Sequence, residues 1–208
     1  MIMAESQAET LLKGARGGAQ EELGDLLEMY RNYLRVLAST QIGNRLRRRV
    51  SASDVVQEAM LAAHRDFGQF RGQSEREFLA WLRRVLLNTI HHAVDTHVKA
   101  QRRDVRREVS IEKVGAALGR SSVNLAGLLA DPGPSPSTPI RREESAVALA
   151  NQLSKLKPEY RDVIVLRNLQ GLSFEEVAAR MDRTSGAVRM LWLRAIEKLR
   201  TFYEPEEK

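Results

Sequence analysis

Apolar residues recur every three to four positions along most of the chain, first up to about residue 108 and again from about residue 143. This spacing places apolar side chains along one face of a helix, whereas a half-buried strand shows strict alternation. The predicted helices span about residues 20–41, 53–67, 75–106, 141–156, 158–169, 173–181 and 184–203. Because no segment alternates as a strand does, we expect an all-α protein with two small helical lobes.

Two helices of the first lobe have apolar stripes that define a common core. In the helix from about residue 53, the stripe comprises Val55, Val56, Ala59, Met60 and Ala63. In the helix from about residue 75, it comprises Phe78, Trp81, Leu82, Val85, Leu86, Thr89 and Ala93. Ser51 or Ser53 is suited to cap the first of these helices, because a serine hydroxyl accepts a hydrogen bond from a free amide at a helix start.

Aromatic residues are scarce, but Phe67, Phe70, Phe78 and Trp81 gather in or beside a predicted loop over residues 68–76. We expect most of them to belong to the core. One that faced outward would provide a surface for stacking an unpaired base.

The second lobe contains a predicted helix-turn-helix. The sequence SFEE (173–176) has the form of a capping box, and Ala178 and Val188 are placed for the close crossing of two short helices. Asp182 occupies the turn position that normally favours glycine. In DNA-binding proteins the outward N-terminal end of the second helix meets base edges and phosphates. Here that end carries Thr184, Ser185 and Arg189. The alternative is a helical hairpin with solvated arginines.

The two predicted domains, residues 1–108 and 141–208, are joined by a linker over residues 109–140. Its sequence GRSSVNLAGLLADPGPSPSTP contains four prolines, each of which removes an amide donor and disfavours helix in the preceding residue. We expect this Pro/Ser-rich tract to be extended. Within it, the segment LAGLL (125–129) is interpreted as one extra helical turn, with a docking segment as the alternative.

The charge balance favours a polyanionic partner. Lys and Arg number 33 against 27 Asp and Glu, which gives a formal net charge of +6. The absence of cysteine excludes disulfides and a cysteine nucleophile and fits a reducing compartment, so we expect the protein to be cytoplasmic. The N-terminal sequence MIMAESQAETLLKGARGG lacks the apolar run of a signal peptide, and no later stretch approaches a membrane span. We therefore expect no insertion into a membrane.

A stripe of cations lies at the end of the third predicted helix. In KAQRRDVRR, the positions i, i+3, i+4, i+7 and i+8 are Lys99, Arg102, Arg103, Arg106 and Arg107. On one helix face these charges repel each other, and phosphates lying along them would relieve the repulsion. A solvated helix end is the alternative, since cations are favoured near a helix C-terminus. A second cluster, RLRRR (45–49), is interpreted as a solvated loop.

An enzyme is the least favoured function class. His91 and Asp95 are four residues apart and would share a helix face, but two ligands do not make a metal site. The chain has neither an HExxH-type pattern nor a glycine-rich loop that cradles phosphate. We therefore expect no catalytic residue, no bound metal and no cofactor.

Two long segments carry a family resemblance. DVVQEAMLAAHRDFGQFRGQSEREFLAWLRRVLLNTIHHAVD (54–95) resembles region 2 of the extracytoplasmic-function (ECF) class of bacterial RNA polymerase sigma factors, a group within the sigma-70 family. LSKLKPEYRDVIVLRNLQGLSFEEVAARMDRTSGAVRMLWLRAIEKLR (153–200) resembles region 4 of the same class. Both lobes, their order and the linker agree, over about residues 10–203. The resemblance implies a sigma factor that binds core polymerase, recognises the −10 and −35 promoter elements and promotes strand opening.

Carried over by position, the resemblance assigns surfaces to individual residues. Docking on the β′ clamp helices of core polymerase is assigned to Asp54, Gln57 and Glu58, on the polar side of their helix. Contacts with the −10 element and the adjoining duplex are assigned to Arg71, Gln73, Ser74, Asn88, His92, Asp95, Lys99, Arg102 and Arg103. Major-groove reading of the −35 element is assigned to Thr184, Ser185, Arg189 and Arg194. The resemblance also implies docking on the β flap and control by an anti-sigma factor.

The chain departs from the family pattern at two places. The family often has an arginine where this chain has Val98, and a polar or basic pair where it has Leu191 and Trp192. These two residues either pack in the lobe or contact a thymine methyl group. The alternative function is a stand-alone helix-turn-helix regulator in which only residues 143–203 bind DNA. That alternative predicts tight operator binding by the purified protein alone.

Overall fold

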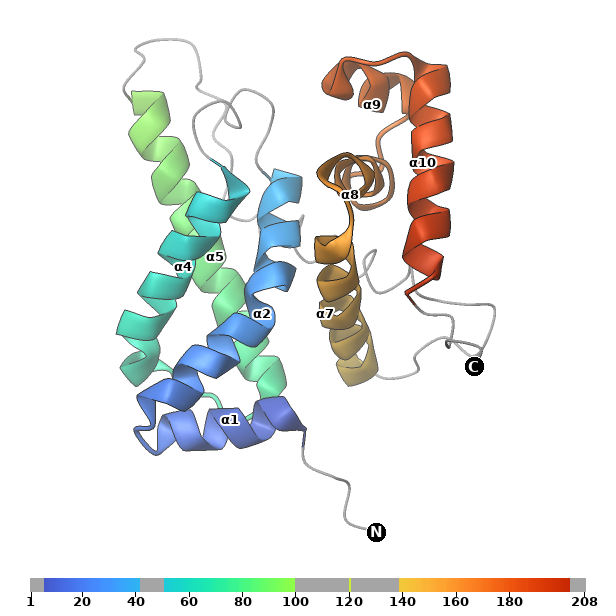
Figure 1. The fold of residues 1–208 in the computed structure, drawn as a ribbon. Coiled ribbons are helices and arrows are strands. Elements are labelled where there is room, and N and C mark those ends of the chain that lie inside the picture. The colour runs from blue at the N-terminus through green and yellow to red at the C-terminus, as the bar shows by residue number, and fades with distance from the viewer. Residues whose placement is uncertain (1–5, 42–50, 100–119, 121–138, 203–208) are drawn as a thin grey trace, which may run out of the picture.

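The computed structural model describes residues 6–41, 51–99, 120 and 139–202, without the side chains of residues 94, 95, 97–99 and 139–145. Every regular element within these ranges is helical. The helices form an N-terminal lobe from α1, α2, α4 and α5, and a C-terminal lobe from α7, α8, α9 and α10 (Figure 1). The predicted all-α fold is confirmed.

The helix bounds agree with most of the sequence prediction. The N-terminal lobe contains α1 (Gln7–Arg16), α2 (Gln20–Gln41), α4 (Ala52–Asp66), a 3-10 turn η1 (Phe67–Gln69) and α5 (Glu75–Lys99). The C-terminal lobe contains α7 (Pro139–Lys155), α8 (Pro158–Ile164), a π-helical turn η2 (Val165–Leu169), α9 (Phe174–Met181) and α10 (Ser185–Arg200). Helix α1 and the change from α- to π-helical geometry after Ile164 were not predicted.

Helix α2 is the centre of the N-terminal lobe and packs against α1, α4 and α5. The carboxylate of Glu75, at the start of α5, forms hydrogen bonds with residues of α2 and of the α1 cap. Its Oε1 accepts a hydrogen bond from the Tyr30 hydroxyl of α2 (2.7 Å), and its Oε2 accepts one from the Ser6 hydroxyl (3.1 Å). Ser6 also caps α1 in a reciprocal capping box with Glu9. The N-terminus of the lobe is therefore fixed by side chains from three helices.

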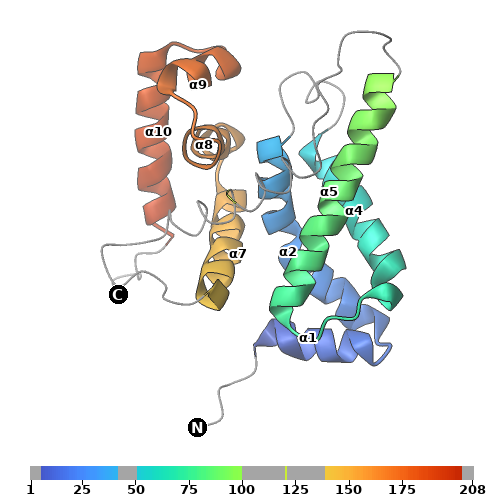
Figure 2. The ribbon, with the colours of Figure 1, turned by 180° about the vertical axis from the view of Figure 1, so that it is seen from behind.

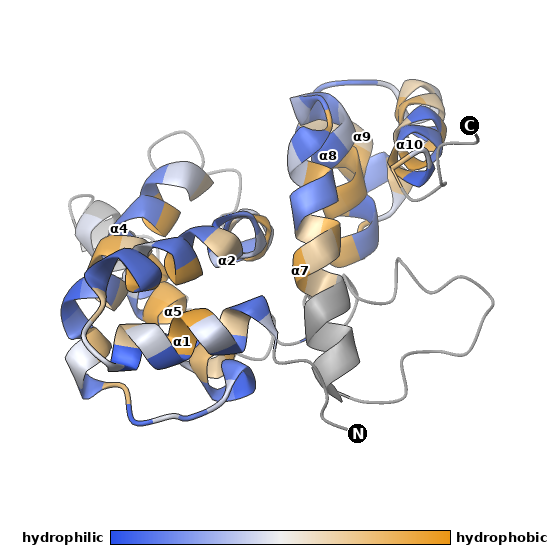
Figure 3. Cartoon of the chain, turned by 60° about the horizontal axis from the view of Figure 1, so that its bottom comes forward, coloured by the Kyte–Doolittle hydropathy of each residue, from blue (hydrophilic) through white to orange (hydrophobic). Residues whose placement is uncertain are grey.

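Phe78 lies at the middle of an aromatic cluster and is fully buried. Its ring centroid is 5.8 Å from that of Tyr30, 5.7 Å from Phe70, 5.7 Å from Trp81 and 6.2 Å from Phe67. Phe67 and Trp81 are only partly buried, at the edge of the cluster. Both predicted apolar stripes face this core, and Figure 3 shows hydrophobic residues mainly on the sides that the helices turn toward one another.

The C-terminal lobe contains the predicted helix-turn-helix. Residues 173–176 form the expected capping box, and Val188 of α10 is fully buried against the α9 side that carries Ala178. Gly171 and Asp182 both have left-handed backbone conformations, with φ of 70° and 54°. Asp182 occupies the position after the last residue of α9, where glycine is usual. A short polar side chain tolerates the left-handed conformation better than a bulky one does.

The two lobes touch through α2, which lies beside α7 in both Figure 1 and Figure 2. Asn32 donates from Nδ2 to Oδ1 of Asn151 (3.0 Å), and Gln170 donates from Nε2 to the carbonyl oxygen of Ser39 (3.3 Å). These bonds are partly buried, and each contributes only about 0.5–1.5 kcal/mol net in water. Buried apolar residues of both lobes also belong to one core cluster, so these bonds are only part of the contact.

Several predictions fall on residues outside the described ranges. They are the extended linker, the LAGLL segment, the cluster at 45–49, and the part of the cation stripe beyond Lys99. The proposed domain ranges therefore stay predictions. Among the described helices none is long and apolar enough to cross a membrane, and the described side chains include no group of three or more metal-ligating residues.

Candidate functional site

The outer face of α4 carries the three residues predicted for docking. Asp54, Gln57 and Glu58 are exposed, while the valines and alanines of the apolar stripe are buried. Of the two candidate caps, Ser51 is used, and its hydroxyl accepts a hydrogen bond from the Asp54 amide (3.1 Å). Leu61 lies one turn further along the same face with 67% of its surface exposed. Sequence analysis missed Leu61, although a leucine outside the apolar stripe was a signal for it.

The loop between η1 and α5 is fixed at its C-terminal end by Glu77. Its Oε2 accepts hydrogen bonds from the amide of Gln73 (2.8 Å), the hydroxyl of Ser74 (2.9 Å) and the amide of Ser74 (3.1 Å). The Gln73 amide, then the Ser74 hydroxyl and amide, hold the pKa of Glu77 below its usual value. Because these bonds are stronger to the ionised carboxylate, this end of the loop is anchored at neutral pH and the anchor weakens as Glu77 is protonated in acid.

Two arginines fix the other end of this loop through backbone carbonyls. Arg16, from the end of α1, donates from Nη1 to the carbonyl oxygen of Gly72 (2.8 Å). Arg71 donates from Nη1 to the carbonyl oxygen of Gly68 (2.9 Å) and is otherwise exposed. The predicted −10 residues Arg71, Gln73 and Ser74 therefore lie on one preformed loop. Arg16 was not predicted, because it lies more than fifty residues away in the sequence.

Replacing Gly72 by alanine is expected to distort this loop. A Cβ atom there would lie 2.4 Å from Cζ of Phe70 and 2.8 Å from Cβ of Glu77. Phe70 is 9% exposed and packs against Phe67 and Trp81, so a shift of its ring disturbs these contacts. We expect Gly72→Ala to lower the free energy of unfolding by about 1–3 kcal/mol, measured by urea denaturation.

The matched control is Gly68→Ala in the same loop, where a Cβ meets no atom within 4 Å. Its free energy of unfolding should stay within about 0.5 kcal/mol of wild type. Equal effects of the two alanines would show that the close contact at Gly72 is not what holds the loop.

An open hollow of about 510 Å³ adjoins the loop. It lies between the α1–α2 turn and the end of α4, and its cationic or aromatic lining residues are Arg16, His64, Arg65, Phe67, Phe70 and Arg71. The partly exposed ring of Phe67 beside three guanidinium groups combines a stacking surface with positive charge. This combination suits an unstacked base and its phosphate.

Asn88 and His92 lie on an exposed face of α5, one helical turn apart. Arg84 is exposed one turn before Asn88 and extends the same line, although sequence analysis did not select it. His91, by contrast, is partly buried, and its Nε2 atom has no hydrogen-bond partner among the described residues. The two neighbouring histidines therefore point in different directions.

The remaining predicted residues of this surface are only partly visible. Asp95 and Lys99 lie on α5, but their side chains are among those left out. Arg102 and Arg103 lie outside the described ranges. Their assignments stay predictions.

The N-terminal end of α10 is arranged as a helix-turn-helix predicts. Thr184 caps the helix by accepting a hydrogen bond from the Ala187 amide (3.3 Å). Ser185 donates to Glu175 of α9 (3.1 Å), and Nη2 of Arg189 lies 3.5 Å from the same carboxylate. Arg189 and Arg194 are both exposed. Arg189 is therefore held at the surface by a weak ion pair, from which a phosphate or base edge can withdraw it.

Leu191 and Trp192, where the chain departs from the family pattern, both pack in the lobe. Leu191 is 6% exposed, and the indole N–H of Trp192 donates to Oδ1 of Asn168 (2.9 Å). The exposed large apolar residues of α10 are instead Met190 and Leu193, at 51% and 52%. Of the two alternatives for Leu191 and Trp192, the structure supports packing within the lobe.

Comparisons with known families match both lobes. The model for sigma-70 region 2 matches residues 26–103, and the model for sigma-70 region 4 matches residues 146–199. The first covers most of α2 and all of α4 and α5, and the second covers part of α7, all of α8 and α9 and nearly all of α10. The two matches occur in the order that the sequence resemblance requires.

Whole-length relatives agree with these matches. The ECF RNA polymerase sigma-E factor of Escherichia coli is 29% identical over 197 residues, which is 95% of this chain and 94% of the relative. The ECF RNA polymerase sigma factor SigD of Mycobacterium tuberculosis is 29% identical over 202 residues, covering 96% of this chain and 85% of the relative. A solved structure of CnrH in complex with the cytosolic domain of CnrY is 23% identical, covers 95% of this chain and 97% of that chain, and has a TM-score of 0.33.

Proposed function

The chain belongs to the ECF class of bacterial RNA polymerase sigma factors, and on this premise we propose which of its surfaces perform each step of initiation. The observation that carries the proposal is the pair of region 2 and region 4 matches, each on its own helical lobe. As a sigma factor, the protein binds core RNA polymerase, recognises the −10 and −35 promoter elements and promotes strand opening. Members of this family are initiation factors.

The outer face of α4 is the proposed docking surface for the β′ clamp helices of core polymerase. Asp54, Gln57 and Glu58 provide charged and polar groups, and Leu61 adds an exposed apolar side chain next to them. An apolar contact within a polar rim is the usual composition of an exchangeable interface. We propose that the C-terminal lobe makes a second contact, with the β flap.

The loop from Gly68 to Ser74 and the adjoining hollow are the proposed site for the −10 element. The loop is preformed by Arg16 and Glu77, so little conformational entropy is lost when a base binds. Arg71 and Phe67 line the hollow, where a flipped base can stack and its phosphate can be neutralised. Asn88 and His92 extend the surface toward the duplex, with Asp95, Lys99, Arg102 and Arg103 assigned by family position.

The N-terminal end of α10 is the proposed reader of the −35 element. Thr184, Ser185, Arg189 and Arg194 are the residues assigned to it, and the first three surround the exposed start of the helix. Because Leu191 and Trp192 pack inward, fewer side chains reach the groove than the family pattern provides. Met190 and Leu193 are exposed in their place and suit contact with thymine methyl groups.

Reading two promoter elements at once requires the lobes to move apart. Elements one and a half to two duplex turns apart are separated by roughly 50–70 Å. A tract of about 20 extended residues spans roughly 60–70 Å, so the linker is long enough. Separation requires contacts with polymerase to replace those between α2 and α7. We further propose that this occurs in the cytoplasm and that an anti-sigma factor opposes it.

Co-elution with bacterial core RNA polymerase tests the docking surface. We expect the wild type to co-elute and the double variant Gln57→Ala/Glu58→Ala to bind about tenfold more weakly, because central interface residues contribute on the order of 1–2 kcal/mol. The matched control is Gln20→Ala/Glu21→Ala, which removes the same two side-chain types from an exposed part of α2. Its affinity should equal that of wild type.

Two results would contradict this assignment. If both double variants bind like wild type, the docking surface lies elsewhere on the protein. If the wild type fails to bind polymerase but binds promoter DNA tightly on its own, the protein behaves as a stand-alone regulator.

A further inference from the structure

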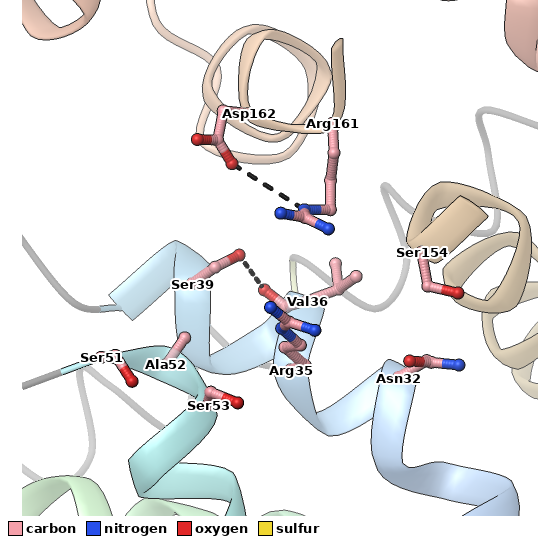
Figure 4. Close-up of a pocket in the computed structure, with 10 residues that line it drawn as sticks. All are labelled: Asn32, Arg35, Val36, Ser39, Ser51, Ala52, Ser53, Ser154, Arg161 and Asp162. Carbon is pink, nitrogen blue, oxygen red and sulfur yellow. Dashed lines mark hydrogen bonds and ion pairs between the residues drawn. The ribbon is translucent and has the colours of Figure 1, made fainter. Parts of the chain in front are cut away.

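A cavity of about 250 Å³ lies between the two lobes (Figure 4). Its walls come from α2 and the start of α4 in the N-terminal lobe, and from the end of α7 and α8 in the C-terminal lobe. The polar lining residues are Asn32, Arg35, Ser39, Ser51, Ser53, Ser154, Arg161 and Asp162. None of them belongs to the surfaces described above for polymerase or DNA.

Two cations face this cavity from opposite lobes. In Figure 4 the guanidinium groups of Arg35, on α2, and Arg161, on α8, point toward one another across the space. Burial lowers the pKa of Arg161, and the charge of Arg35 acts in the same direction, while Asp162 opposes them. An arginine stays protonated at every physiological pH. The two positive charges therefore repel each other in the folded protein.

The one carboxylate in the cavity leaves one of these two positive charges uncompensated. Asp162 lies 3.9 Å from Nε of Arg161, at the outer limit of an ion pair, and no hydrogen bond joins them. Arg35 has no ion pair or hydrogen bond with another residue in the described part of the chain. Two guanidinium groups and one carboxylate leave the cavity with a net positive charge.

Some serine hydroxyls of the cavity already donate a hydrogen bond within the protein, and others can donate to a ligand. The hydroxyls of Ser39 and Ser154 donate to the carbonyl oxygens of Val36 and Asn151, both at 2.7 Å. The oxygen of Ser51 only accepts, from the Asp54 amide, so its proton remains available. Ser53 follows two positions later on the exposed start of α4 and offers a second hydroxyl. Free donors and the positive end of α4 therefore converge from the same side.

We propose that this cavity binds a small phosphate anion, either free phosphate or diphosphate or the phosphate group of a small metabolite, between Arg35 and Arg161. Guanidinium groups bind phosphate oxygens in pairs, and a tetrahedral anion offers oxygens to both arginines and to the Ser51 and Ser53 hydroxyls at once. The volume is below the roughly 300–1,000 Å³ of pockets for drug-sized ligands, and it corresponds to the space of roughly eight water molecules. The part of the ligand inside the cavity is therefore an anionic group and not a complete nucleotide.

Such an anion bridges the lobes, since one arginine belongs to each. A ligand that binds only the closed arrangement stabilises it by mass action. Bound phosphate therefore favours the form in which α2 touches α7 and opposes separation of the lobes.

Titration of the full chain with three probes tests the proposal. Orthophosphate, diphosphate and glycerol phosphate are each added at constant ionic strength set with chloride, and binding is followed by calorimetry and by amide NMR shifts. We expect saturable binding of at least one probe, with shifts at the start of α4 and in α8 that follow a single Kd. The tightest probe then identifies the source of the phosphate group.

Substitution identifies the residues responsible. Arg35→Gln and Arg161→Gln should each weaken binding about tenfold or more, because each removes charge-assisted hydrogen bonds. The control Arg31→Gln removes the same charge from the exposed side of α2, where Arg31 pairs with Glu28 (2.6 Å), and should leave the Kd unchanged. Three results would overturn the proposal: no saturable binding, shifts confined to one lobe, or equal affinity in all three variants.

Discussion

Val188→Asp is expected to unfold the C-terminal lobe and to abolish promoter recognition by α10. Val188 is fully buried where α10 crosses α9, and no Lys or Arg is buried among the described residues to pair with a new carboxylate. Burying an unpaired charge costs several kcal/mol even after the group takes up a proton. A small lobe of this kind has a comparable total stability. The measurement is the loss of helical signal in far-UV circular dichroism together with the loss of dispersed amide resonances.

The matched control is Ala187→Asp, one position earlier and exposed. It adds the same charge to the first turn of α10, where an anion is tolerated by the helix dipole. Retention of the native spectrum in Ala187→Asp and its loss in Val188→Asp locate the effect at the helix crossing. A folded Val188→Asp lobe would contradict the proposed packing of α9 against α10.

Phe78→Ala is expected to be the most destabilising simple truncation in the N-terminal lobe. The side chain is fully buried and contacts four other aromatic rings, so its removal leaves a cavity that rigid rings cannot close. Comparable truncations cost about 3–5 kcal/mol. Urea denaturation followed by circular dichroism should show this as a lower free energy of unfolding.

The control for truncating an apolar side chain is Leu61→Ala. Leu61 is 67% exposed, so its effect on stability should stay within about 0.5 kcal/mol. Its effect on polymerase binding is a separate measurement, because Leu61 lies on the proposed docking surface. If Phe78→Ala cost less than about 1 kcal/mol, the aromatic cluster would not be the core of the lobe.

The local features of this protein were predictable because their causes are local. The SFEE capping box, the stripes on α4 and α5, and the crossing at Ala178 and Val188 depend on residues within a few turns of one another. The same is true of the exposed faces that carry Gln57, Glu58 and Arg189.

Features that depend on distant parts of the chain were missed. Helix α1 is short and contains Gly14, and its position depends on Ser6 meeting Glu75. Arg16 reaches the loop before α5 for the same reason. The inward packing of Trp192, next to Leu191, includes a hydrogen bond to Asn168. The spacing of apolar residues along α10 does not identify that partner. The cavity between the lobes requires α2 and α8 to be placed in space, which no single segment determines.

The distribution of tryptophan has a practical consequence. The chain contains two tryptophans, Trp81 in the N-terminal aromatic cluster and Trp192 in the C-terminal lobe. Trp81 lies among apolar rings, whereas the indole N–H of Trp192 is bonded to the Asn168 amide, so the two fluorophores have different surroundings. Replacing either one by phenylalanine leaves one tryptophan, which then reports on a single lobe. Each lobe of the isolated protein can therefore be followed by its own tryptophan fluorescence, without an attached dye.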